Sequence, residues 1–173
     1  MHVLDIVAAN DAAHARFLAT FEDALVAFTA LECSAAARAW NALGASMNAH
    51  QAVEEELLAV LATYTDAPAP RGGATALVLA EHRRLDQLHA IAAQQIAVVQ
   101  ATPVAARRLA MVRALEDVLR FQRLLEHHGL REAEIVYPHV IELLPAEVCT
   151  TFAERLASDA RASVGGAIDD SVD

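Results

Sequence analysis

Two His-x-x-x-Glu pairs, His50/Glu54 and His128/Glu132, constrain the fold of this 173-residue chain more than any other feature. In an α-helix, side chains four residues apart project from the same face, about one turn from each other. Each pair can therefore present an imidazole and a carboxylate to one buried centre. Two such pairs on separate helices are typical of a helical bundle in whose interior the side chains meet.

The rest of the sequence favours an all-α fold. Apolar side chains recur at three- and four-residue spacing, strand-like alternation is missing, and Ala, the best helix former, is abundant. Prolines and glycines between Asp66 and Gly73 mark the clearest loop. We therefore expect four long helices over residues 10–32, 34–65, 74–100 and 102–137, with N-caps at Asn10 or Asp11, at Ser34 and at Thr102.

Short links between these helices predict an up-down-up-down four-helix bundle, followed by a short extra C-terminal helix. The bundle should span residues 5–144, with Pro138 ending or kinking the fourth helix, and the extra helix should follow Pro145 over residues 145–162. Residues 163–173 are small and acidic without a core-forming pattern. We expect this tail to be disordered.

Neighbouring residues indicate which histidines face the core. His128 shares its helix face with Phe121 and Leu125. The adjacent His127 instead shares its face with charged residues. An unpaired buried carboxylate costs several kcal/mol, and a metal ion would supply its partner. The same test gives six inward-facing candidate metal ligands, with every long helix contributing: His14, His50, Glu54, His82, His128 and Glu132.

Three residues near these candidates have open roles. Asp86 lies four residues after His82, and His89 lies two turns after it on the same helix. Either could be a metal ligand, a hydrogen-bond partner that orients a ligand imidazole, or a surface group. Gly129, next to His128, either relieves crowding near the centre or is a tolerated helical glycine.

The two tyrosines are not counted among the ligands. Helix spacing places Tyr64 about 20 Å from His50 along the second helix. Tyr137 is nine residues after His128, which puts it on roughly the opposite face of a regular helix.

Composition excludes several classes of partner. The chain has 23 acidic and 13 basic residues, and its net charge of −10 would repel nucleic-acid phosphates and anionic membranes. No secretory signal and no apolar run long enough to span a membrane is present. Cys33 and Cys149 form no Cys-x-x-Cys motif, so a thiolate metal site is not indicated. We expect a cytoplasmic monomer or homodimer without nucleic-acid or membrane partners.

The order of the candidate ligands resembles that of the hemerythrin-like family, also called the HHE cation-binding domain. The family order of His, His-x-x-x-Glu, His, His-x-x-x-Glu is met by His14, His50/Glu54, His82 and His128/Glu132, and the family-like ending is met by Tyr137-Pro138. The resemblance covers about residues 5–144. It implies a four-helix bundle with two non-haem iron ions, bridging carboxylates, terminal imidazoles and an oxo or hydroxo bridge. Carboxylate and imidazole donors without thiolates agree with iron, and manganese or zinc is an alternative.

The resemblance also implies a function. Coordination positions left open would admit O2, peroxide or nitric oxide in an oxygen, redox or iron response, with peroxide-decomposing (catalase-like) or oxidase activity as one form. Asp86 stands where the oxygen-carrying members have the second His of a His-x-x-x-His pair, which argues against reversible oxygen carriage. The alternatives are a metal-responsive sensing or interaction module without turnover, and a metal-free structural bundle.

Overall fold

Every regular element that the structure describes is helical. The computed structural model describes residues 5–66 and 68–165, and no strand occurs among them, which confirms the all-α prediction. None of these described helices is both long and apolar enough to cross a membrane. The elements in chain order are α1 (Ile6–Thr29), α2 (Cys33–Tyr64), α3 (Thr75–Ala101), α4 (Val104–Arg131), the π-helical turn η1 (Glu132–Val136), α5 (Tyr137–Leu143) and α6 (Ala146–Gly165).

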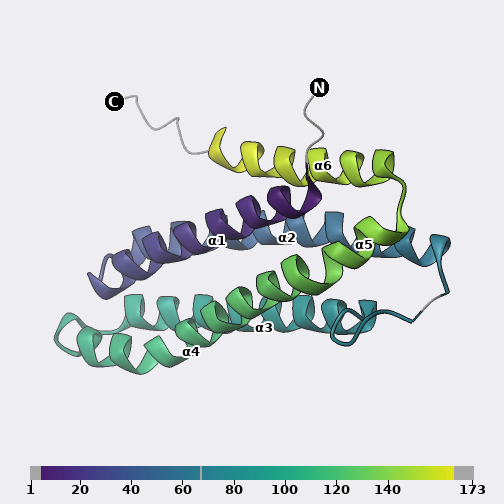
Figure 1. Ribbon diagram of the computed structural model, residues 1–173. Coiled ribbons are helices and arrows are strands. Elements are labelled where there is room, and N and C mark those ends of the chain that lie inside the picture. Colours follow the sequence, from purple (N-terminus) through teal and green to yellow (C-terminus); the bar gives the residue numbers. More distant parts are fainter. Residues whose placement is uncertain (1–4, 67, 166–173) are drawn as a thin grey trace.

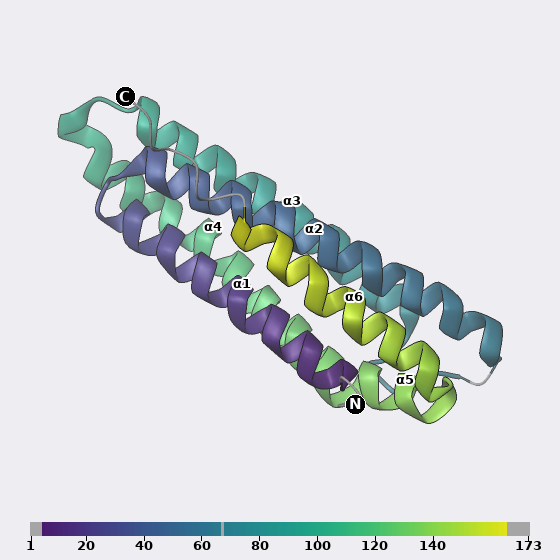
Figure 2. The ribbon, with the colours of Figure 1, turned by 90° about the horizontal axis from the view of Figure 1, so that it is seen from above.

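Four long helices pack side by side around a shared interior (Figure 1). Consecutive helices run in opposite directions, α1 contacts α2 and α4, and α3 contacts the same two helices. The view from above in Figure 2 shows α6 lying over α1 and α2, and it contacts both. The helices are thus placed so that side chains from all four long elements can meet in the interior.

The first helix begins earlier than the sequence predicts. Its N-cap is Asp5, not Asn10 or Asp11, because the Asp5 carboxylate accepts a hydrogen bond of 2.9 Å from the backbone N–H of Val7. Asn10 is instead fully buried within α1. The turn into α2 contains Leu31 with φ of 63°, a left-handed conformation more often taken by glycine. For that reason the sequence signals this boundary weakly.

Two other predicted caps have different roles. Ser34 lies inside α2, whose N-cap position is Glu32, and its hydroxyl accepts a hydrogen bond from Gln100. The hydroxyl of Thr102 donates to the carbonyl of Val98 at 2.7 Å, so this residue closes α3 and does not cap α4. Both hydroxyls are therefore used in tertiary or preceding-turn contacts.

The fourth long helix does not end at Pro138 but continues through η1 into α5. In η1 the backbone N–H of Tyr137 bonds to the carbonyl of Glu132, five residues back, so the turn holds one more residue than an α-helical turn. Pro138, in the first turn of α5, cannot donate a backbone hydrogen bond, and its ring would clash with the carbonyl four residues back. The wider turn just before it accommodates the proline without ending the helix.

Buried apolar side chains form two clusters, one toward each end of the molecule. The first includes Phe21, Trp40 and Phe121 and involves α1 to α4. The second includes Leu57 and Tyr137 and involves the starts of α1 and α3, the second half of α2, η1, α5 and α6. Along the helices, buried histidines and glutamates lie between the residues of the first cluster and those of the second.

The C-terminal helix is longer than predicted and completes the second cluster. α6 extends from Ala146 to Gly165, beyond the expected end at residue 162, and buries Phe152, Ala153 and Leu156. The predicted disordered tail, 163–173, therefore begins inside a helix. Its remainder, 166–173, lies outside the described residues.

Candidate metal centre

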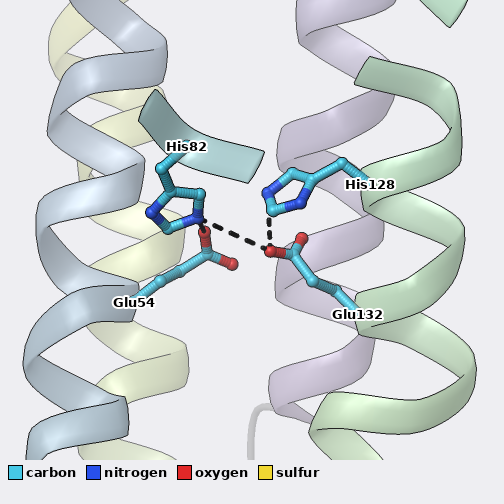
Figure 3. Close-up of side chains that lie close together, drawn as sticks. All are labelled: Glu54, His82, His128 and Glu132. Carbon is cyan, nitrogen blue, oxygen red and sulfur yellow. Dashed lines mark ion pairs between the residues drawn. The ribbon is translucent and has the colours of Figure 1, made fainter. Parts of the chain in front are cut away.

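The six side chains predicted as metal ligands come together between the two apolar clusters. None of the six residues is more than 8% exposed. Figure 3 shows four of them converging from three directions. His14 comes from α1, His50 and Glu54 from α2, His82 from α3, His128 from the last turn of α4, and Glu132 from the first residue of η1.

The carboxylate of Glu132 lies between two sets of imidazoles. One oxygen, Oε2, is 2.9 Å from Nε2 of His14. The other, Oε1, is 2.8 Å from Nε2 of His128 and 4.0 Å from Nε2 of His82. Each oxygen therefore faces a different group of nitrogens.

Glu54 repeats this arrangement from the other side. Its Oε1 is 3.1 Å from Nε2 of His50, and its Oε2 is 3.3 Å from Nε2 of His82. The ligand atoms form two groups, in each of which the atoms lie within 4.8 Å of one another. One, the His82 group, contains Glu54, His82, His128 and Glu132; the other, the His14 group, contains His14, His50 and Glu132.

Most of these atoms have no hydrogen-bond partner. The Nε2 atoms of all four histidines, Oε2 of Glu54 and both carboxylate oxygens of Glu132 are buried and make no hydrogen bond, so their contacts of 2.8 to 3.3 Å with each other are ion pairs alone. Leaving a buried donor or acceptor unsatisfied costs about 1–3 kcal/mol, and more for a charged group. Metal ions bonded to these nitrogens and oxygens would satisfy all of them, so the donor set fits a dinuclear centre.

Opposite charges stabilise the cluster when no metal is bound. Burial alone would lower the pKa of His128, but the carboxylate of Glu132 outweighs this effect and raises it to about 9. At His82 burial also lowers the pKa, but Glu132 and Glu54 outweigh this effect and raise the pKa to about 10. Burial raises the pKa of Glu54, yet His50 and His82 together lower it to about 2. Protons and metal ions therefore compete for the same nitrogens.

Two carboxylates outside the cluster orient the imidazoles of the His82 group. Nδ1 of His82 lies 3.1 Å from Oε1 of Glu55, and Nδ1 of His128 lies 3.1 Å from Oε2 of Glu81. Because a carboxylate only accepts, each Nδ1 donates, so Nε2 is the nitrogen that releases its proton when a metal ion binds. Among the described contacts, no carboxylate lies against Nδ1 of His14 or His50.

Glu81 is itself held in place by Arg131. Nε of Arg131 donates to both carboxylate oxygens of Glu81 at 3.1 Å, and its Nη1 donates to the carbonyl of Gly72 at 3.2 Å. Sequence reasoning missed Glu81, because its contacts are with α4, about 50 residues away along the chain. It also missed Glu55, whose side chain is 51% exposed but reaches His82.

Tyr137 also lies where sequence reasoning did not expect it. Its hydroxyl donates a hydrogen bond of 2.7 Å to Oε1 of Glu54, and the residue is only 1% exposed. The extra residue in η1 rotates Tyr137 from the face opposite His128 to the interior. Burial and the Glu54 carboxylate raise the pKa of Tyr137 well above its usual value, so the phenol stays protonated and donates. Tyr64, by contrast, is 51% exposed.

The structure does not bring Asp86 and His89 to the cluster. Asp86 is exposed on α3. The His89 ring stacks on Trp40 at a centroid distance of 5.0 Å, its Nε2 lies 2.9 Å from the Trp40 carbonyl, and the indole N–H donates to the carbonyl of His89. His89 therefore links α3 to α2, and the candidate centre contains only the six side chains.

Gly129 has the crowding role considered from the sequence. A Cβ atom at this position would lie 2.6 Å from Nδ1 and 2.9 Å from Cγ of His14. The His14 ring thus packs directly against the backbone of α4, in space that any larger residue would occupy.

A small cavity opens beside the His14 group. Its walls include His14 and His50, the apolar side chains of Phe17, Leu85 and Leu125, and the amide of Gln51. It offers about 10 Å³ to the centre of a water molecule, which is space for roughly one water. Only a very small molecule can therefore reach the centre from this side.

The assignment of a metal centre rests on the geometry of this chain alone. Comparison with protein-family models, curated proteins and solved structures found no match in any of the three.

Proposed function

We propose that the chain is a hemerythrin-like protein, an up-down-up-down four-helix bundle that holds two non-haem iron ions. One observation carries the proposal: Glu54 and Glu132 each turn one oxygen toward the His14 side and the other toward the His82 side of the cluster. A carboxylate placed in this way would offer one oxygen to each of two ions. The four unpaired Nε2 atoms supply the terminal ligands.

The chemistry of the donors favours iron. Carboxylate oxygens and imidazole nitrogens suit Fe(II) and Fe(III), and neither free cysteine is among the grouped ligands. Six side chains leave coordination positions free on two octahedral ions, for an oxo or hydroxo bridge and for an external ligand. Iron there would supply redox chemistry and Lewis acidity toward O2, peroxide or nitric oxide, with peroxide decomposition as the activity to test.

The surrounding residues hold the ligands in one arrangement. Tyr137 fixes the carboxylate of Glu54 by its hydrogen bond, while Glu55 and Glu81 select the tautomers of His82 and His128. The apolar walls of the cavity keep bulk water from the His14 side. These side chains preorganise the centre before any ligand arrives.

The test is metal content per chain in protein expressed without a tag in iron-supplemented cells. We expect about two irons in the wild type, a large loss in Glu54→Gln and Glu132→Gln, and full occupancy in the control His89→Gln, which removes a half-buried imidazole outside the cluster. No bound transition metal in the wild type, even after anaerobic loading with Fe(II), would refute the proposal. Oxygen evolution from added peroxide then tests turnover in the loaded protein.

A metal-responsive sensing module is the second candidate. Arg131 connects Glu81, and through it His128, to the carbonyl of Gly72 in the α2–α3 loop. Metal binding at His128 can therefore reach a surface segment. If this function applies, hydrogen exchange of residues 68–74 slows on metal loading and Arg131→Met abolishes the difference. Equal exchange with and without metal would argue against it.

A further inference from the structure

Gln51 is a buried polar residue that the proposed ligand set does not use. It follows His50 on α2 and is only 7% exposed. Its amide nitrogen Nε2 is buried and has no hydrogen-bond partner among the described residues. Leaving such a donor unsatisfied is costly, so its position calls for an acceptor that the protein itself does not provide.

The surroundings of Gln51 indicate where that acceptor binds. Its side chain lines the small cavity beside His14 and His50, together with apolar residues such as Met47 and Leu85. Apart from the histidines, Gln51 is the only polar residue in this lining. A molecule in the cavity is thus in contact with the His14 side of the centre and with the amide at once.

We infer that Gln51 determines ligand specificity, donating a hydrogen bond from Nε2 to a small anionic ligand bound at the metal between His14 and His50. The inference rests on the proposed function and goes beyond it by assigning a specificity-determining residue, which favours an anion with an acceptor atom beyond the metal-bound one. Such a ligand gains a hydrogen bond in an otherwise apolar space. A neutral ligand with a weak acceptor gains much less.

Azide serves as the probe, because it is a small anion with a terminal acceptor and its binding to ferric iron is visible as a charge-transfer absorption. We expect Gln51→Leu to weaken azide binding to the iron-loaded protein about 10-fold, equal to about 1.4 kcal/mol. Gln51→Glu, which places a negative charge at the same site, should weaken it further. Nitric oxide affinity should change less than about threefold in Gln51→Leu.

The control is Gln95→Leu, which makes the same substitution on α3, where the amide donates to Asp117 away from the centre. It should bind azide like the wild type. Iron content is measured for every variant first, so that loss of the centre and loss of the hydrogen bond are told apart. Two irons per chain with unchanged azide affinity in Gln51→Leu would overturn the inference and leave the proposed function standing. Absence of iron from the wild type would refute both.

Discussion

Replacing Gly129 by Ala should remove one metal position while the helical fold stays in place. The new Cβ would lie 2.6 Å from Nδ1 of His14, whereas ordinary contacts begin at 3.4 Å, so the ring must move by about 0.8 Å. Metal–ligand distances tolerate only about 0.2 Å. In the proposed centre, His14 could then no longer bind an ion shared with His50 and Glu132.

Global stability should change little, which separates the effect from unfolding. Alanine is favoured over glycine in a helix by about 1 kcal/mol, and this gain offsets part of the strain at His14. Anaerobic titration with Fe(II), followed by removal of weakly bound metal, should give about two ions per chain for the wild type and about one for Gly129→Ala. Circular dichroism and urea unfolding of the metal-free proteins check the fold.

Gly44→Ala is the matched control. Its Cβ would lie 2.5 Å from Cε1 of the His89 ring, a similar clash between a helical glycine and an imidazole, but one outside the cluster. This variant should lose stability through the contact of His89 with Trp40 and still bind two ions. If Gly129→Ala binds two ions as tightly as the wild type, His14 is not a ligand and the two-position geometry is wrong.

Three further predictions follow from the contacts around the cluster. Tyr137→Phe removes the hydrogen bond to Glu54 and should lower the free energy of unfolding of the metal-free protein by about 1–3 kcal/mol in urea titrations; an unchanged midpoint would contradict the bond. Glu81→Gln should weaken metal binding about 10- to 100-fold in competition with a chelator, and equal affinity would show that Glu81 does not orient the imidazole of His128. Burial lowers the pKa of His82 and His128, but the buried glutamates outweigh it and raise the pKa values to about 10 and about 9, above the usual 6.5. The stabilisation that these two charged imidazoles contribute to the metal-free protein should therefore be fully present below pH 6.5 and be lost as the pH rises through 9 to 10. Metal affinity should instead increase with pH, and urea unfolding at several pH values, with and without metal, would expose the opposite trend.

Helical periodicity was sufficient to predict the all-helical fold and the six side chains of the cluster. His128 and His127 differ by 100° around the helix, and their neighbours alone assign one to the interior and the other to solvent, as the structure confirms. The same rule failed at Tyr137, because a π-helical turn changes the phase of the helix and no motif marks it in advance.

The sequence also could not predict which residues on other helices form hydrogen bonds with the cluster. Glu81 precedes His82 in the chain but serves His128, on another helix, and Glu55 serves His82 across the α2–α3 contact. Gln51 follows a predicted ligand, yet its role depends on which side chains wall the cavity. The missing information in each case is the identity of the facing residue, which spacing along one helix does not contain.

The charged layer that divides the apolar interior has a consequence for how the molecule melts. Continuous hydrophobic contact makes a domain unfold as one unit. Here that contact is interrupted between the first apolar cluster, which includes Phe21, and the second, which includes Tyr137. Metal ions bonded to residues of all four long helices would cross-link these helices between the two clusters. Without metal, the part of the interior that α6 closes would be joined to the rest less firmly.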